Sequence, residues 1–158
     1  MWQTKVEEAM KYTTMRALIL HKETPLDVAI EKFVTGDETR AIFLVDGSGR
    51  LVGVINNHSL LQWARLRFGE SAGVKNLSLS HVRRMVMADV IADLALPGSE
   101  DATVSVDDTL AEAVDKMSQY NLLDIPVIDR DGRIVDDLRL SEILSFAMKH
   151  DRTTAETA

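Results

Sequence analysis

The sequence predicts an α/β protein of the α+β type, built from two β-α-β-β-α repeats that pack on each other with pseudo-twofold symmetry. Three observations predict it. A stretch of 19 residues recurs 83 positions later, each copy holds a Gly-containing turn between two short apolar runs, and each copy has a helical apolar stripe before that turn. One copy alone has too few layers to bury its helices and small sheet, so the copies are expected to share a core.

The repeat is clearest between Asp46–Ala64 and Asp129–Ala147, which align without gaps. Six of these 19 pairs are identical, including the Gly and Arg of the turn, and four more are like for like. Upstream, Thr24–Phe33 matches Asp108–Met117 at an offset of 84. Two adjacent copies of about 65 residues each follow from this self-similarity.

Each repeat is predicted to begin with a strand and a helix. The strand candidates are Arg16–Leu20 and Ala102–Val106. In the first repeat, Thr24 is expected to cap the helix, with Pro25 at the first helical position. Apolar residues at helical spacing mark the buried stripe of both helices: Leu26, Ala29, Ile30 and Phe33 in one copy, and Leu110, Ala113, Val114 and Met117 in the other.

A hairpin and a final helix complete each repeat. The hairpin strands are predicted at Ala41–Val45 and Leu51–Ile55, and again at Ile125–Ile128 and Ile134–Leu138. The sequences Asp-Gly-Ser-Gly and Asp-Arg-Asp-Gly between them are typical of hairpin turns. Matching apolar residues mark the final helices: Leu60, Leu61 and Ala64 in the first copy, and Ile143, Leu144 and Ala147 in the second.

These patterns divide the chain into four parts. The first repeat is expected at residues 1–72, a linker at 73–85, the second repeat at 86–150 and a mobile tail at 151–158. Gly and Ser residues between 69 and 80 favour an irregular junction there. The tail has no anchor in a core, which favours mobility.

Composition excludes several classes of protein. The 158 residues include no Cys, which excludes a disulfide scaffold, a thiolate metal site and a Cys nucleophile. No apolar run approaches the roughly 18 residues of a membrane span, and the N-terminus lacks a signal-peptide pattern, so a cytoplasmic protein with no membrane partner is expected. The net charge of −7 argues against nucleic acid as a partner.

The charge is unevenly distributed along the chain. Residues 1–88 hold 12 Lys+Arg and 9 Asp+Glu, whereas residues 89–142 hold 4 and 14. The asymmetry can simply reflect two differently solvated surfaces. If the chain has an anion site, the asymmetry places it nearer the basic first half.

Catalytic and metal-binding patterns are missing from the sequence. Its four histidines lack metal-ligand spacing: His21, His58, His81 and His150. There is no nucleophile elbow, phosphate-binding loop or dinucleotide fingerprint. We therefore expect no enzymatic activity, no catalytic residue and no metal.

The doubled pattern resembles the pair of cystathionine-β-synthase (CBS) domains that is called a Bateman module. Four short motifs carry the resemblance: V-x-x-A-M at Val6–Met10, T-P-L at Thr24–Leu26, I-P-V at Ile125–Val127 and G-R-[LI]-V before each last helix. Their order, recurring at matched spacing over residues 5–150, is specific for the family.

The resemblance implies a regulatory, ligand-sensing module rather than an enzyme. Such modules bind an adenosine-type ligand (AMP, ADP, ATP or S-adenosylmethionine) in the cleft between the repeats. Binding is transmitted by conformational change to a regulated protein, which the sequence does not name. The resemblance also implies a homodimer, with no cofactor required beyond such a ligand.

The family's ligand motif is G-h-h-[TS]-x-x-D, which spans the last strand and the start of the last helix. There the hydroxyl reaches phosphate, and the Asp accepts both ribose hydroxyls. In the first repeat Gly53 is kept, while Asn56 and Ser59 replace Thr and Asp. In the second repeat the Gly is lost, and Arg139 and Glu142 stand at these positions. The resemblance therefore implies that only the second repeat keeps ribose-type chemistry.

Further ligand contacts are implied at two other places. One is Thr24, the residue before the first helix, where the family's hydroxyl is kept. The other is the segment before the second strand of each repeat, which flanks the base: Thr39, Arg40 and Ala41 in the first repeat, and Leu122, Leu123 and Asp124 in the second.

Two alternatives to these ligand roles stay open at this point. Asn56 and Ser141 are ordinary N-cap residues, and Ser59 or Glu142 suits the first turn of a helix, so these side chains can serve the helices alone. The whole module can also be free of ligand, acting as a dimerisation or partner-docking piece in which the nucleotide motifs are degraded.

Overall fold

Two compact units make up the chain. A computed structural model describes residues 3–10, 17–36, 41–69 and 78–157, with side chains through Arg152. We call Leu18–Asp101 the repeat-1 unit, because it holds the sheet of the first repeat. The repeat-2 unit combines Met1–Ala17 with Ala102–Ala158.

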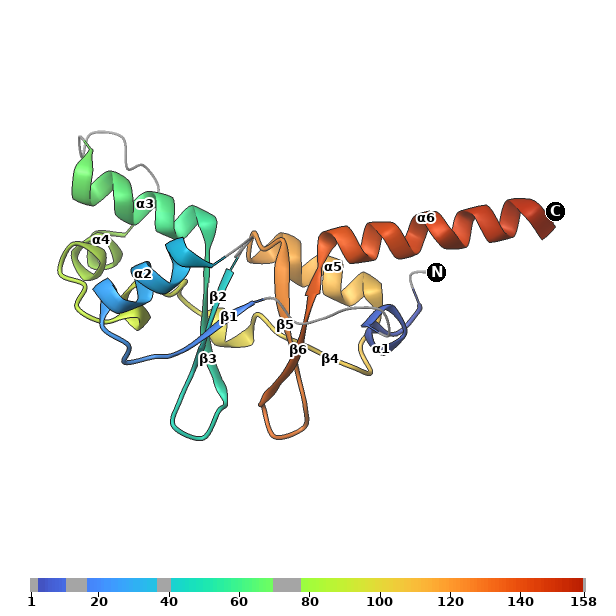
Figure 1. Cartoon of the computed structure of the whole chain (residues 1–158), viewed down its shortest axis with the longest axis horizontal. Coiled ribbons are helices and arrows are strands. Elements are labelled where there is room, and N and C mark those ends of the chain that lie inside the picture. The colour runs from blue at the N-terminus through green and yellow to red at the C-terminus, as the bar shows by residue number, and fades with distance from the viewer. Residues whose placement is uncertain (1–2, 11–16, 37–40, 70–77, 158) are drawn as a thin grey trace. The chain divides into compact units, whose positions relative to one another are not determined.

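The repeat-1 unit is a three-stranded sheet with helices. Its strands are β1 (Leu18–His21), β2 (Ala41–Val45) and β3 (Leu51–Asn56), in the order β1-β2-β3. The β1–β2 pair is parallel and the β2–β3 pair is antiparallel. Its helices are α2 (Leu26–Thr35), α3 (Asn57–Phe68) and α4 (Leu79–Val86), followed by the 3₁₀ turns η2 (Ile91–Leu94) and η3 (Ser99–Asp101). Figure 1 labels these strands and α-helices.

The core of the repeat-1 unit follows the predicted apolar pattern. Leu20, Ile42, Leu44 and Ile55 come from alternate positions of the strands, so they share one face of the sheet. The helices and η2 cover that face with the remaining buried core residues: Ala29, Met85, Ile91 and Leu94. The predicted stripe on the first helix therefore contributes directly to the core.

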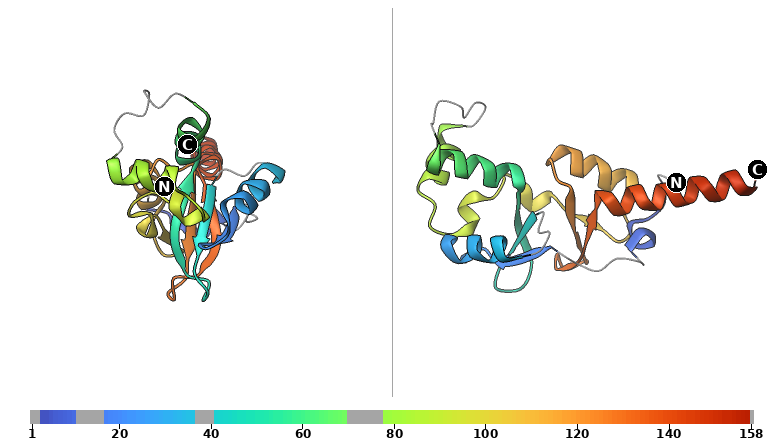
Figure 2. Two further views of the ribbon diagram at one scale, coloured as in Figure 1. Left: turned by 90° about the vertical axis from the view of Figure 1, so that its left-hand side faces the viewer. Right: turned by 45° about the horizontal axis from the view of Figure 1, so that its top comes forward.

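The repeat-2 unit has the same topology. Its strands β4 (Val104–Ser105), β5 (Asp124–Ile128) and β6 (Ile134–Arg139) pair in the order β4-β5-β6, parallel and then antiparallel. Helices α1 (Val6–Met10), α5 (Leu110–Gln119) and α6 (Leu140–Thr157) complete it. Both hairpins can be followed in Figure 2. The two sheets with helices confirm the predicted α+β class with two repeats.

The two hairpins match in detail. Each ladder has a register irregularity at the same place, between Leu44 and Val45 in one and between Val127 and Ile128 in the other. In each turn an Asp carboxylate accepts hydrogen bonds from the backbone N–H groups two and four residues on. Gly49 and Gly132 have φ of 82° and 80°, a conformation that favours glycine. The turn chemistry predicted from the sequence is confirmed.

The segment that leads into each repeat belongs to the unit of the other repeat. In the repeat-2 unit, Val6 donates to the Asp108 carbonyl at 2.8 Å, and Leu110 donates to the carbonyl of Thr4 at 2.8 Å. In the repeat-1 unit, Leu26 donates to Asp89 and Ile91 donates to Thr24, both at 2.9 Å. The start of α1 and the start of η2 are thus equivalent positions. This exchange explains why the repeat-2 unit is discontinuous in sequence.

Several element limits differ from the predictions. The first strands are Leu18–His21 and Val104–Ser105. Thr24 does not cap α2: Pro25 occupies the N-cap position without a side-chain bond, and the hydroxyl of Thr24 instead donates to the His21 carbonyl at 2.7 Å. Ser141 does not cap α6 either, because that helix begins at Leu140.

Two segments expected to be irregular contain helix. α4 (Leu79–Val86) occupies most of the second half of the predicted linker 73–85 and ends one residue beyond it, because Ser78 caps the helix and Met85 supplies a buried apolar anchor. The backbone is helical through Thr157, since no Gly or Pro interrupts α6. The repeat limits drawn from the sequence, and the mobility of residues 151–158, stay predictions.

Candidate functional site

The predicted ligand-binding residues gather where the hairpin strands of each sheet begin and end. Ala41, the first residue of β2, pairs with Asn56, the last residue of β3. In the other unit, Asp124 pairs with Arg139 in the same way. The next helix follows at once, so Ser59 and Glu142 lie in its first turn. We call these two places the strand ends of the repeat-1 and repeat-2 units.

The described residues of the repeat-1 strand end carry no ionisable side chain. Asn56 is buried and caps α3, with its Oδ1 accepting from the Ser59 amide at 2.8 Å. Ala41, Phe43 and Val54 share the face of Asn56 in the ladder and are buried as well. The Ser59 hydroxyl is fully buried, and no described atom is its hydrogen-bond partner. The capping role of Asn56 is confirmed. The hydroxyl of Ser59, by contrast, makes no hydrogen bond to the described residues.

Close packing explains the glycine at position 53 of β3. The Ser99 hydroxyl of η3 accepts from the Val54 amide at 2.9 Å, which brings η3 against β3. A Cβ at Gly53 would lie 3.3 Å from the Cβ of Ala95 and 3.5 Å from Ser99 Oγ. Packing against the η2–η3 segment therefore accounts for this glycine without a ligand.

The repeat-2 strand end is charged. Arg139 contacts Glu142 through both Nε and Nη2, and its Nε lies 4.0 Å from Asp137 Oδ2. Arg139 and Glu142 side chains are only 12% and 13% exposed. The predicted residues Arg139 and Glu142 are therefore brought together, but as partners of each other. The guanidinium, which stands where the family's hydroxyl reaches phosphate, is already paired with carboxylates.

Asp124 and Asp137 form an acidic pair beside Arg139. They lie on the same face of the β5–β6 ladder, and both are buried. Burial, followed by a hydrogen bond with Asp137 and the charge of Asp137, raises the pKa of Asp124 to about 9. At neutral pH Asp124 therefore keeps a proton and can donate a hydrogen bond. Its Oδ1 atom has no hydrogen-bond partner among the described residues.

Two neighbouring carboxyl groups are also perturbed. Burial raises the pKa of Glu142, although the adjacent Arg139 opposes that shift. Burial also raises the pKa of Asp136, which lies on the other face of β6. Glu142 Oε2, like Asp124 Oδ1, is buried without a described hydrogen-bond partner. The repeat-2 strand end thus holds acceptor atoms that the described part of the chain leaves unsatisfied.

The end of α5 positions Asp124. Asn121 adopts φ of 52° after the helix, a left-handed conformation that Asn tolerates. The Leu122 amide then donates back to the Met117 carbonyl at 2.8 Å, and the Leu122 side chain is buried. Leu123 is exposed, while its carbonyl accepts from Leu140 at the start of α6 at 3.0 Å. These contacts fix where β5 begins.

The remaining predicted site residues are less informative. Thr39 and Arg40 lie outside the described residues. The hydroxyl of Thr24 is engaged in the turn with His21. Sequence reasoning missed Asp137, because its pairing with Asp124 follows from the strand register. The Asp136-Asp137 dipeptide was the available signal. Side chains alternate between the two faces of a strand, so Asp137 must lie on the same face as Arg139.

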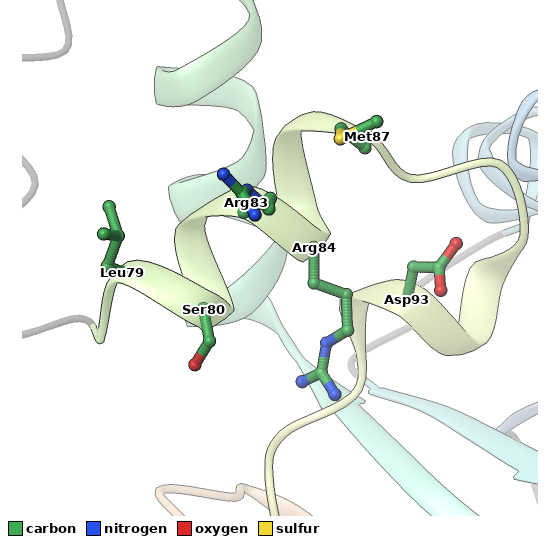
Figure 3. A pocket seen from close by; sticks show the side chains of 6 residues that line it. All are labelled: Leu79, Ser80, Arg83, Arg84, Met87 and Asp93. Carbon is green, nitrogen blue, oxygen red and sulfur yellow. The ribbon is translucent and has the colours of Figure 1, made fainter.

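A basic hollow on α4 is a second feature that could bind an anion. It measures about 510 Å³ and is lined by Leu79, Ser80, Arg83, Arg84, Met87 and Asp93. Figure 3 shows Arg83 and Arg84 leaving the helix in different directions. Arg84 donates to the Ala95 carbonyl at 3.3 Å and contacts His81, while Asp93 accepts from two backbone amides. The two arginines therefore do not converge on one point.

Across residues 3–10, 17–36, 41–69 and 78–157, no three His, Asp or Glu side chains are grouped so as to hold a metal ion. None of the helices in these ranges combines the length and apolar character needed to cross a membrane.

Comparison with known proteins places these features in a family. A protein-family model described as CBS domain matches residues 5–65 and 78–149. Among curated proteins, none matches the chain. Among solved structures, a CBS domain-containing protein from Thermotoga maritima is similar, with a TM-score of 0.74, 26% identity, and coverage of 93% of this chain and 96% of the other.

Two further similar structures were solved with ligands. CBSX2 in complex with AMP has a TM-score of 0.70 at 20% identity, covering 92% of this chain and 97% of its own. The CBS domain pair of protein MJ0100, in complex with 5′-methylthioadenosine and S-adenosyl-L-methionine, has a TM-score of 0.62 at 18% identity, covering 90% and 98%. At these identities the similarity concerns the fold.

Proposed function

Because the chain belongs to the CBS domain family, we propose that it is a regulatory CBS pair that binds an adenosine-type ligand. Ligand binding would favour one conformation of the pair, and a regulated protein would respond to that conformation. The proposed role is regulatory rather than catalytic. Structures of similar fold contain AMP, or 5′-methylthioadenosine and S-adenosylmethionine, which supports this ligand class.

One observation of this chain carries the proposal. At equivalent positions after the last strand, the Ser59 hydroxyl and one Glu142 oxygen are buried without a described hydrogen-bond partner. Asp124 adds a third such atom at the start of β5. A buried polar atom left without a partner costs free energy, so such atoms are commonly satisfied by a water or a ligand. The hydroxyl groups of a ribose and the amino group of an adenine would donate hydrogen bonds to these oxygen atoms.

Isothermal titration calorimetry tests the proposal on the full chain. The panel is AMP, ADP, ATP, 5′-methylthioadenosine and S-adenosylmethionine, with cytidine as a control that keeps the ribose but lacks adenine. We expect saturable heat with at least one adenosine compound and none with cytidine. The absence of heat and of any change in melting temperature with every compound at millimolar concentration would contradict the proposal.

A specific observation also favours a docking role through dimerisation. A hollow of about 950 Å³ lies between α2, α3 and α4, and it is bordered by the exposed apolar residues Val34, Val86 and Met87. Three acidic residues, Asp27, Glu31 and Asp89, and one basic residue, Arg67 of α3, also line this hollow. Exposed apolar groups gathered at one surface mark a protein–protein contact, and the acidic residues of one copy would pair with Arg67 of a second copy. We therefore propose a homodimer formed through this hollow.

Sedimentation equilibrium separates this role from that of an isolated monomer. We expect a dimer for the unmodified chain and dissociation for the variant Val86→Glu. The matched control is Val135→Glu, which places the same charge at an exposed Val on β6. A monomer at all concentrations, or an equal effect of the two variants, would contradict dimerisation through this surface.

A further inference from the structure

The repeat-2 strand end holds more acidic than basic side chains. Three carboxyl groups, those of Asp124, Asp137 and Glu142, surround the single guanidinium of Arg139. The corresponding residues of the repeat-1 unit carry no ionisable side chain: Ala41, Val54, Ser59 and Asn56. The acidic character is therefore not a consequence of the fold, because the same backbone positions are neutral in the other repeat.

The charge of Arg139 is not available to a bound anion. Its Nε and Nη2 both contact one oxygen of Glu142, and its Nε also lies 4.0 Å from Asp137. A phosphate would have to break the contact with Glu142, and it would leave that buried carboxylate unpaired. Breaking a buried ion pair in this way is strongly unfavourable. Like charges placed close together in a poorly solvated site add to the cost.

The same site is suited to groups that donate hydrogen bonds. Asp124 is 2% exposed, and its Oδ1 atom lacks a partner among the described residues. Glu142 Oε2 likewise has no hydrogen-bond partner among the described residues. The raised pKa of Asp124 means that one carboxyl can also donate at neutral pH. Hydroxyl and amino groups would satisfy these atoms, and a positive charge would be stabilised by the remaining carboxylates.

We propose that the repeat-2 strand end selects adenosine-type ligands whose 5′ substituent is neutral or cationic, such as a thioether or sulfonium nucleoside, over ligands that carry phosphate. This selectivity rests on the proposed function, because it presumes that an adenosine-type ligand binds. It goes beyond that function by assigning the discrimination to Asp124, Asp137 and Glu142. It also excludes phosphate from the position at which the family's hydroxyl reaches it, because Arg139 stands there and is paired with Glu142.

The test compares dissociation constants of 5′-methylthioadenosine and AMP by calorimetry, on the full chain at pH 7.5. These probes share the adenosine and differ in the 5′ group. We expect 5′-methylthioadenosine to bind at least about tenfold more tightly than AMP. The double variant Asp124→Ala/Asp137→Val, which installs the residues of the repeat-1 unit, should reduce this ratio at least about tenfold by improving AMP binding.

Two controls keep the result interpretable. Asp115→Asn, at an exposed position of α5, removes one negative charge away from the site and should leave the ratio unchanged. If the double variant does not fold by circular dichroism, Asp137→Asn replaces it, since that change removes the carboxylate beside Arg139 and keeps the shape of the side chain. Its expected effect has the same sign and is smaller.

The outcomes distinguish the two proposals. Equal affinities, tighter binding of AMP, or a ratio that the site variants leave unchanged would overturn the selectivity while leaving ligand binding intact. No binding of either probe, or of any compound in the wider panel, would overturn the proposed function and the selectivity with it.

Discussion

At the same point of the repeated topology, the repeat-1 unit places Ala41 opposite Asn56, whereas the repeat-2 unit places Asp124 opposite Arg139. The strand pairing, the register irregularity and the hairpin turns are the same in both. Buried apolar residues and Asp-Gly turns therefore determine the fold of each repeat. The side chains at the strand ends differ between the repeats, so the shared topology does not depend on one particular set of residues there.

The two strand ends also differ in how the following helix starts. In the repeat-1 unit, Asn56 satisfies the first turn of α3 by accepting from the Ser59 amide. In the repeat-2 unit, the equivalent side chain is Arg139, which has no acceptor atom and instead contacts Glu142 in the first turn of α6. One repeat thus uses a neutral cap, and the other uses a buried ion pair. We therefore expect mutations at these two positions to change the free energy of unfolding by different amounts.

The largest difference is expected when the residue at this position is shortened or neutralised. Arg139→Met should lower the free energy of unfolding by about 3–5 kcal/mol, because it leaves buried carboxylates without their cation. Asn56→Ala at the equivalent position should cost only about 1 kcal/mol, the usual cost of losing an N-cap. Urea unfolding at pH 7.5 measures both. Equal losses in the two variants would break the comparison.

Replacing Asp124 is expected to change the free energy of unfolding less, and to raise it rather than lower it. Its pKa is about 9 in the folded chain and near 3.8 when unfolded, so the folded state holds more protons between these values. The contribution of this group to stability therefore falls as pH rises from about 4 to about 9. Asp124→Asn should flatten this slope and raise the free energy of unfolding at pH 8 by about 1–3 kcal/mol.

Unfolding measured at several pH values checks this expectation. The exposed Asp115→Asn variant serves as control and should keep the pH profile of the unmodified chain. A profile of Asp124→Asn that parallels the unmodified chain would show that Asp124 is ionised in the folded state.

The smallest expected change in stability concerns the hairpin turn, which the two repeats share. Gly49→Ala and Gly132→Ala each place a side chain at a φ near +80°. Both should lower the free energy of unfolding by about 1 kcal/mol. Thermal or urea unfolding should show losses that agree within about 0.5 kcal/mol. A clear inequality would mean that the two turns are not equivalent in energy.

Local features were predictable from the sequence to a large extent. The hairpins were predicted because Asp46 and Asp129 begin matched turns, and the capping role of Asn56 follows from its residue type. The prediction for Thr24 failed, because its hydroxyl is used within the preceding turn. The short helix α4 was missed because the helix itself buries a single apolar side chain, Met85, and follows a Gly- and Ser-containing stretch of sequence.

Long-range features were not predictable in the same way. The hydrogen bonds that join Val6 to Asp108, and Ile91 to Thr24, connect segments that no local pattern relates. The strand ends show the same problem on a smaller scale. The sequence identified Asp124, Arg139 and Glu142 one by one, but only the register of β5 and β6 reveals Asp137 and the ion pair that occupies Arg139.

The most direct test of the account compares the residue that follows the last strand in each repeat. Calorimetry with 5′-methylthioadenosine would be performed on Glu142→Ala and on Ser59→Ala. The account predicts that Glu142→Ala weakens binding at least about tenfold, since a charged acceptor is lost, and that Ser59→Ala changes affinity less than about threefold. Equal effects, or a larger loss for Ser59→Ala, would contradict the assignment of ligand recognition to the repeat-2 strand end.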